Sequence, residues 1–287
     1  MSLDGVLMVL ALFAYIVSAL ALVGYFFTRS EWMKNLGAPL AIAGCLAQFG
    51  QLIARFTETG VWPLLNLYGS LSLFAAMSVA IFIVFAMKYK LWFAGGFVVA
   101  IAAIFLAYGV TWNEGVMPAV PSLQSYWAKI HVPLVVSAYA AFMVSFVFSA
   151  LYLARYYVER SAVRAPIPNA SGSATAVSGW LSSLPSLPQL DILVYRSVAV
   201  GLPLLTLGVI TGAMWAHEAW GAYWQWDPKE TAALFSWIIY AAYMHLHTWR
   251  AFRGVVSNWV AVVGFISIIF CYLGVNIWIS GLHSYKM

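Results

Sequence analysis

Long apolar runs recur along most of this chain, and they restrict its fold more than any other feature. They occupy residues 6–27, 37–54, 70–87, 91–111, 132–154, 194–215, 231–249 and 256–278. Each is near the roughly 20 residues that a helix needs to cross the hydrocarbon core of a bilayer. A soluble globular class is excluded because 64% of the residues are hydrophobic and only 8% are charged. The sequence therefore predicts an all-α polytopic integral membrane protein with about eight transmembrane helices.

The first apolar run and the two cysteines have simple structural interpretations. The run from Val6 to Phe27 is too long and too poorly flanked for a cleavable signal peptide, so we expect a retained helix. Cys45 and Cys271 are isolated within apolar runs, and the chain has no CxxC motif. Neither a thiol–disulfide relay nor a zinc site is indicated.

Lysine and arginine are distributed unequally between the two sides that these spans define. One side carries ten of the fourteen: Arg29, Lys34, Lys88, Lys90, Arg155, Arg160, Arg164, Arg196, Arg250 and Arg253. Cytoplasmic loops carry the excess of such residues. We therefore expect both termini and the segment 215–231 on the outer, periplasmic or extracytoplasmic face of the cytoplasmic (inner) membrane. The net charge of +5 follows from this topology and does not indicate nucleic acid.

We interpret residues 1–287 as a single membrane domain. One long connection within it separates two groups of spans. Five spans precede it in residues 6–157, and three follow in residues 191–287. Between them, residues 158–190 are rich in Ser, Ala, Gly and Pro and are expected to form a flexible cytoplasmic linker.

The segment WAHEAWGAYWQWDPKET, residues 215–231, concentrates aromatic side chains beside charges. Interfacial anchoring explains one or two tryptophans. The larger group is more typical of a platform for a flat apolar ligand such as a porphyrin, whose propionates require a cation such as Lys229 or Arg55. The aromatic residues are Trp215, Trp220, Tyr223, Trp224 and Trp226.

The end of this segment also has the pattern of a helix start. Asp227 suits the N-cap, Pro228 the first helical position, and Glu230 completes a capping box. This predicts a structural role for both carboxylates, which does not exclude a functional one. Their charges do not by themselves indicate acid–base catalysis.

The histidines strengthen the porphyrin interpretation. His131 and His283 are expected at the outer face, flanking the aromatic segment from opposite ends of the chain, and two facing imidazoles can complete the coordination of haem iron. His245 lies about 26 Å deeper along its helix, where an ionisable residue suggests function. His247 is about 200° further round that helix and is expected to be an interface residue. Since residues 1–130 contain no histidine, a second histidine ligand for a haem bound by His245 would come from another chain.

Several stretches resemble one known family. WGAYWQWDPKET resembles the signature of the haem-handling WWD-motif family of cytochrome c biogenesis, and the whole chain is similar to its CcsA or ResC-like branch of system II. GVWPLLNLYGSL, LQSYWAKIHVPL, WIIYAAYMHLH and ISGLHSY match other parts of that branch. The chain departs from the family pattern at His217, Gly69 and Ala232.

The resemblance implies a function and its partners. His131 and His283 would ligate an external haem, and His245 a haem inside the membrane, with Trp215, Trp220, Tyr223, Trp224, Trp226, Asp227 and Lys229 at the haem site. The transported ligand and substrate would be haem b, exported and attached to the CxxCH thiols of apocytochrome c. The chain would act as a cytochrome c synthase, or haem lyase, with a ResB-like membrane partner that supplies the second intramembrane histidine. Thiol-reducing proteins would take part indirectly.

Three alternatives stay open at this point. One is a CcmC-like haem chaperone that passes haem to a carrier without forming the thioether. Another is a b-type electron-transfer protein, which needs two facing histidines inside the bundle. The third is a haem-free transporter whose aromatic residues form an interfacial belt.

Overall fold

The computed structural model describes residues 2–113, 115, 121–164 and 184–279, and these ranges contain helices and turns but no strand. The helices are α1 (Leu3–Thr28), α2 (Glu31–Thr59), α3 (Leu67–Tyr89), α4 (Gly95–Val110), α5 (Tyr126–Arg164), α7 (Leu187–Trp220), α8 (Pro228–Thr248), α9 (Val255–Ile269) and α10 (Val275–Trp278). Short 3₁₀ turns occupy Trp92–Ala94 and Pro121–Gln124, and a π-helical turn, Phe270–Gly274, joins α9 to α10.

Seven helical segments of the described chain are long and apolar enough to cross a membrane. The eighth predicted span is α8, which has 21 residues and is therefore also about 30 Å long. Its mean hydropathy is lower because several of its residues are polar, including the buried Ser236, Tyr240, Tyr243 and His247. The prediction of an all-α polytopic membrane protein is confirmed.

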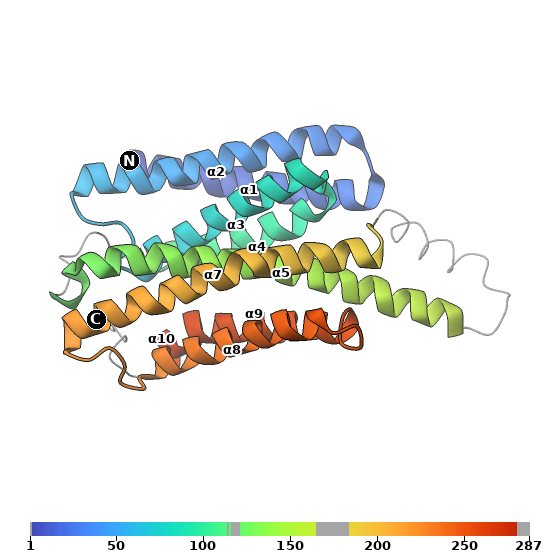
Figure 1. Cartoon of the computed structure of the whole chain (residues 1–287). Helices are drawn as coiled ribbons and strands as arrows, with labels where there is room; N and C mark the ends of the chain where they lie inside the picture. The colour runs from blue at the N-terminus through green and yellow to red at the C-terminus, as the bar shows by residue number, and fades with distance from the viewer. Residues whose placement is uncertain (1, 114, 116–120, 165–183, 280–287) are drawn as a thin grey trace.

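The helices form three groups, which Figure 1 shows from one side. α1, α2, α3 and α4 pack together, and α3 contacts α5. The long helices α5 and α7 form the centre of the molecule and have the most extensive mutual contact. α8 and α9 pack against each other on the far side of this pair.

Small residues permit close packing at the centre. A Cβ atom added to Gly201 of α7 would lie 2.6 Å from the ring of Phe142 of α5. That ring in turn stacks on Tyr240 of α8, with 3.6 Å between centroids. Such small residues at helix crossings are typical of membrane bundles, where contact between helices replaces the hydrophobic effect.

The boundaries of the expected linker differ from the prediction. α5 continues to Arg164 and α7 begins at Leu187, so both ends of 158–190 are helical. Ser186 and Gln189 form a capping box that starts α7. Apolar length does not locate these ends, because a helix can extend beyond the hydrocarbon core. Residues 165–183 lie outside the described residues.

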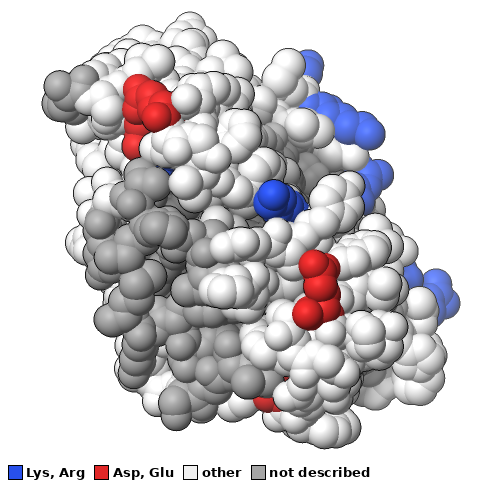
Figure 2. Space-filling view, turned by 90° about the vertical axis from the view of Figure 1, so that its left-hand side faces the viewer, with Lys and Arg blue, Asp and Glu red and all other residues white. Residues whose placement is uncertain are grey.

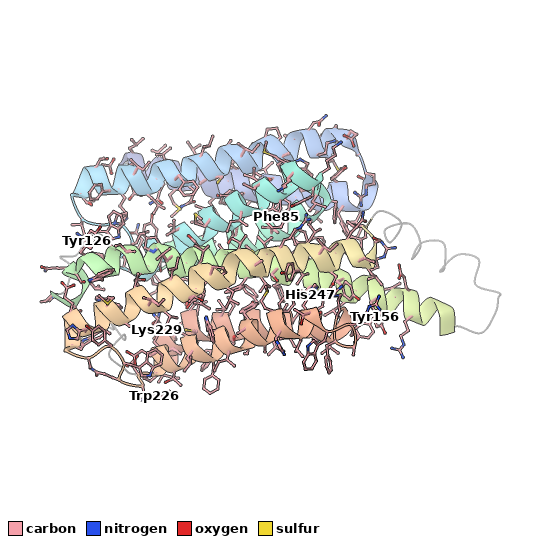
Figure 3. The ribbon with its side chains drawn as sticks, viewed as in Figure 1. Phe85, Tyr126, Tyr156, Trp226, Lys229 and His247 are labelled. Carbon is pink, nitrogen blue, oxygen red and sulfur yellow. The ribbon has the colours of Figure 1, made fainter. Side chains whose placement is uncertain are left out.

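The two ends of the bundle differ in their charges. The α1–α2, α3–α4 and α8–α9 connections, with Arg29, Lys90 and Arg250, share one end. α1 begins and α10 ends at the other end, where Figure 3 places Trp226 and Tyr126. Figure 2 looks onto this second end, whose described surface is mostly uncharged, with acidic and basic side chains scattered singly.

Candidate functional site

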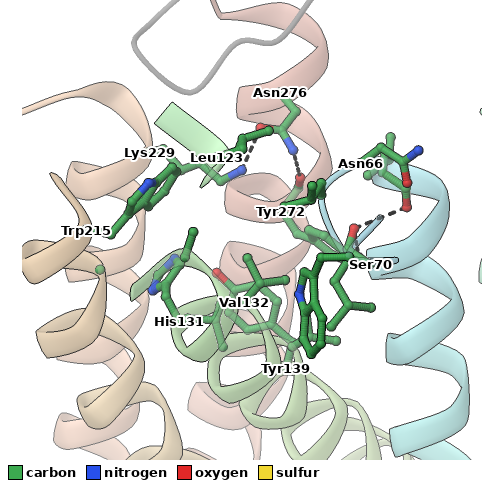
Figure 4. A pocket seen from close by; sticks show the side chains of 18 of the residues that line it. Asn66, Ser70, Leu123, His131, Val132, Tyr139, Trp215, Lys229, Tyr272 and Asn276 are labelled. Carbon is green, nitrogen blue, oxygen red and sulfur yellow. Dashed lines mark hydrogen bonds between the residues drawn. The ribbon is translucent and has the colours of Figure 1, made fainter. Parts of the chain in front are cut away.

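A cavity of about 430 Å³ opens near the second end of the bundle. One part of it is lined by α5, α7, α8 and the last span, Val255–Trp278, which comprises α9, the π-helical turn and α10. The rest is lined by α2, α3, the loop between them and described residues of the α4–α5 connection. In Figure 4, His131, Trp215 and Lys229 lie on one side, Asn66 and Ser70 lie on the other, and Tyr272 lies between them. The volume and the mainly apolar lining are those of a small-molecule site.

His131 lines this cavity from α5, and its tautomer is defined by a hydrogen bond. Its Nδ1 lies 2.7 Å from the carbonyl oxygen of Gly208 on α7. Because a carbonyl oxygen only accepts, Nδ1 carries the ring proton and donates it. In the neutral ring this leaves the lone pair on Nε2, as a histidine ligand of a metal requires.

The close approach of α7 to this imidazole depends on Gly212. A Cβ atom at this position would lie 2.8 Å from two atoms of the His131 ring. Gly212 is itself part of the cavity lining. Any side chain here would push the imidazole away from its position beside α7.

Trp215 forms the aromatic wall beside His131. Its indole is buried, donates a hydrogen bond from Nε1 to Ser122 O at 2.7 Å, and lies 5.7 Å from the imidazole, between ring centroids. Ser125 Oγ donates a hydrogen bond to Glu218 Oε2, which also holds the end of α7 against the start of α5. These bonds hold the platform in place without help from a ligand.

The structure brings only part of the predicted aromatic platform to the cavity. Tyr223 and Trp224 line it together with Trp215. Trp220 packs on Trp215 from outside the described lining, with 5.1 Å between centroids. Trp226 is 68% exposed and is not among the described lining residues.

Asp227 has the geometry of the predicted helix cap. Its carboxylate accepts a hydrogen bond from the backbone N–H of Lys229 at 3.1 Å, and Glu230 accepts one from the backbone N–H of Asp227 at 3.2 Å. The capping box at the start of α8 is complete. A cap accounts for both carboxylates.

Lys229 points toward the last span and lines the cavity. Its ammonium donates a hydrogen bond to Asn276 Oδ1 at 2.7 Å, and Asn276 Nδ2 donates one to Tyr272 O at 2.8 Å. Among the described residues, no carboxylate oxygen lies within 4 Å of Lys229 Nζ. An ammonium in a mainly apolar cavity with no carboxylate in direct contact among the described residues is costly, so this position favours an anionic ligand.

The other candidate cation, Arg55, is already paired. Its Nη1 donates to Asp4 Oδ2 at 3.0 Å, and its guanidinium lies 4.5 Å above the ring centre of Tyr68. Although Arg55 lines the cavity, its charge is compensated within α1 and α2. Of the two, Lys229 is the cation available to a ligand.

The sequence did not reveal the wall that the last span contributes. Tyr272 Oη donates a hydrogen bond to Ser70 Oγ of α3 at 3.0 Å, which joins residues 202 positions apart. Tyr272 lies in the π-helical turn Phe270–Gly274, and Asn276 follows in α10; π-helical turns within α-helices are frequent at functional sites. No pattern in the sequence marks such a turn.

Gly69 explains one departure from the family pattern. A Cβ atom here would lie 1.7 Å from Pro63 O, so the α2–α3 loop packs directly on this glycine. Asn66 caps α3 and accepts a hydrogen bond from Gly69 N at 2.9 Å. His217, another departure, is exposed, stacks on Tyr223 at 4.2 Å between centroids, and is not among the described lining residues.

His245 and His247 lie on opposite faces of α8, as their spacing predicts. His245 is exposed on the outer face of the bundle, one turn from the end of α8. His247, expected near the membrane interface, lies in the last turn of α8, where it is buried and lies 2.9 Å from Asp191 of α7. The sequence does not show which buried carboxylate faces it. His283 lies outside the described residues.

Comparisons with known proteins agree with this architecture. The family model "Cytochrome C assembly protein" matches residues 64–283. The chain belongs to this family. It is 35% identical to the cytochrome c biogenesis protein CcsA of Synechococcus sp. (strain CC9902), over 95% of this chain and 94% of that one. It is 33% identical to CcsA of Gloeobacter violaceus (strain ATCC 29082 / PCC 7421), over 90% and 88%. The chain is thus a CcsA-like protein of cytochrome c biogenesis.

A solved structure has the same fold. The cytochrome c haem lyase CcmF superposes with a TM-score of 0.65 at 16% identity. The match covers 94% of this chain and 46% of that one. At this identity the likeness concerns the fold alone.

Proposed function

We propose that this CcsA-like chain binds haem in the cavity and presents it at the outer face of the membrane for covalent attachment to apocytochrome c. One observation carries the proposal. The imidazole of His131, held through Nδ1, and the Lys229 ammonium, which has no carboxylate oxygen within 4 Å among the described residues, face the same aromatic-walled cavity. A porphyrin iron, its propionates and its flat apolar faces match these three features.

Each group of residues has a distinct part in haem binding. His131 would be one axial ligand, through Nε2, and His283 the other. Lys229 would bind a propionate, held in place by Asn276. Trp215, Tyr223 and Trp224 would pack on the porphyrin, while Trp220 supports Trp215 from behind.

The attachment chemistry needs no catalytic acid or nucleophile from this chain. The S–H bond of each cysteine in CxxCH adds across one haem vinyl group, which forms a C–S and a C–H bond and releases nothing. The protein contributes by holding haem in one orientation, so that the thiols meet the vinyl groups productively. Asp227 therefore acts by starting α8, and the synthase activity depends on binding and orientation.

His245 would ligate a second haem position inside the membrane. Because it is exposed on α8, it can be reached only from outside the bundle. A ResB-like partner that supplies a facing histidine would complete that site. Haem b would then pass from this position to the outer cavity, and thiol-reducing proteins would keep the cysteines of apocytochrome c available.

Absorption spectroscopy tests the outer site. The chain is purified with its ResB-like partner as wild type, His131→Ala and His217→Ala. We expect low-spin b-type bands in wild type, their loss at the outer site in His131→Ala, and their recovery when imidazole is added. His217→Ala is the matched control, because His217 lies in the same aromatic segment but outside the described cavity lining. Unchanged bands in His131→Ala would remove this residue as a ligand.

A further inference from the structure

A second buried polar cluster lies at the other end of α8, far from the cavity. Figure 3 shows Lys229 and His247 toward opposite ends of this helix. His247 Nε2 lies 2.9 Å from Asp191 Oδ2, and both side chains are about nine-tenths buried. Haem binding at the outer cavity does not use this pair.

Three helices meet at Asp191. Its Oδ2 pairs with His247 of α8, and its Oδ1 accepts a hydrogen bond from Asn258 Nδ2 of α9 at 2.9 Å. Arg253 Nε donates to His247 O at 3.0 Å, which closes the turn between α8 and α9. Asp191 of α7 therefore fixes the ends of both following helices.

His247 is enclosed too tightly to bind haem itself. Its ring stacks on Tyr195 of α7 at 4.8 Å and lies 5.7 Å from Tyr243, between centroids. Its Nε2 is engaged by Asp191. The exposed imidazole two residues earlier, His245, is the one that another molecule can reach.

Apolar burial alone does not define how α8 is rotated about its axis. Its outward face carries Phe235 and Ile238, whereas its buried face carries Ser236, Tyr240, Tyr243 and His247. In a bilayer, lipid solvates apolar side chains as well as the protein interior does. The polar contacts of the buried face must therefore specify the rotation, and a carboxylate buried without its partner is strongly unfavourable.

We propose that the Asp191–His247 pair, with Asn258, sets the rotation of α8 and so directs His245 out of the bundle. Residues 245 and 247 lie about 200° apart on the helix, so holding His247 inward holds His245 outward. Asp191, His247 and Asn258 are thus positioning residues for the intramembrane haem ligand. The importance of that direction rests on the proposed function, but the direction itself can be measured without haem.

Thiol labelling measures the direction. The His245→Cys chain, purified with its partner removed, is treated with a lipid-soluble maleimide, and the modified peptide is identified by mass spectrometry. We expect rapid modification, which falls about tenfold when Asp191→Leu or His247→Leu is added. The exchanged pair, Asp191→His with His247→Asp, should restore the rapid modification of the cysteine at position 245. Ser267→Ala is the matched control, because it removes the Ser267–Ser236 contact of α9 with α8 elsewhere along the helix.

The outcomes separate this inference from the proposed function. Unchanged labelling of His245→Cys in both Asp191→Leu and His247→Leu would overturn the positioning role. The same conclusion would follow if the exchanged pair lost as much labelling as the two leucine variants. In the complex with the partner, Asp191→Leu should also lose the haem bands that depend on His245, and imidazole should restore them. If labelling follows the prediction but wild type has no His245-dependent haem, the positioning pair stands and the intramembrane haem site fails.

Discussion

At Lys229 the chain holds an ammonium group beside one amide oxygen in an otherwise mainly apolar cavity. The capping carboxylates Asp227 and Glu230 are engaged with backbone N–H groups of the same turn. Among the described residues no carboxylate oxygen lies within 4 Å of Lys229 Nζ, and this arrangement favours an acidic ligand. The same reasoning excludes Arg55 as the cation that binds an acidic ligand, because Asp4 already neutralises its charge.

Replacing Lys229 should weaken haem binding through the propionate. We expect Lys229→Met to lower haem affinity about thirtyfold, the value of a charge-assisted hydrogen bond in a buried site. Titration of the purified chain with haem and with haem dimethyl ester measures this. The ester lacks the carboxylate, so wild type and Lys229→Met should bind it equally. A loss of equal size for both ligands would contradict the propionate contact.

Gly212 sets the position of His131. We expect Gly212→Ala to displace the imidazole and lower haem affinity about tenfold, because the new Cβ would lie 2.8 Å from the ring. Haem titration and thermal unfolding are compared with Gly24→Ala. That glycine is also helical, but its Cβ would meet only the flexible side chain of Met33. Similar haem affinities for the two variants would show that His131 tolerates the added methyl group.

At the scale of elements, α8 connects the outer cavity with the buried polar cluster around His247. Its N-cap is Asp227, its first turn carries Lys229, and its last turn carries His245 and His247. Two side-chain hydrogen bonds between described residues attach it to α7. These are Trp237 Nε1 to Thr206 Oγ1 at 2.8 Å and the His247–Asp191 pair. The outer cavity and the inner histidine thus depend on one helix.

Two variants distinguish a capping role of the Asp227 carboxylate from a role in acid–base chemistry. We expect Asp227→Ala to destabilise the protein by about 1 kcal/mol, because the orphan N–H groups of the first turn lose their acceptor. Asp227→Asn retains an acceptor and should restore both the melting temperature and cytochrome c assembly. Full stability with lost assembly in Asp227→Asn would instead assign the carboxylate a chemical role.

At the scale of the whole molecule, the end with Arg29, Lys90 and Arg250 is predicted to face the cytoplasm. Alkaline phosphatase fused after residue 287 should then be active, and the same enzyme inserted after residue 170 should be inactive. A green fluorescent protein at the same two positions should show the reverse pattern. Active phosphatase at position 170 would show that the topology is the opposite of the predicted one and that the cavity lies on the cytoplasmic side.

Much of the architecture followed from local patterns. Apolar length located the membrane helices, because crossing a bilayer requires about 20 apolar residues whatever their packing. WDPKE predicted the start of α8, because a capping box is complete within four residues. Tryptophan density and family resemblance indicated the site, and the structure placed His131, Trp215 and Lys229 around one cavity.

Contacts between distant residues were decided only by the tertiary structure. The tautomer of His131 depends on Gly208, the pairing of Lys229 on Asn276, and the burial of His247 on Asp191. Each of these contacts joins different helices. In a bilayer the outer surface of a helix is as apolar as its core-facing side, so hydrophobic pattern does not show which face turns inward. The sequence by itself therefore determined that the chain spans the membrane and where α8 begins, whereas the packing of α5, α7, α8 and the last span determined which side chains meet.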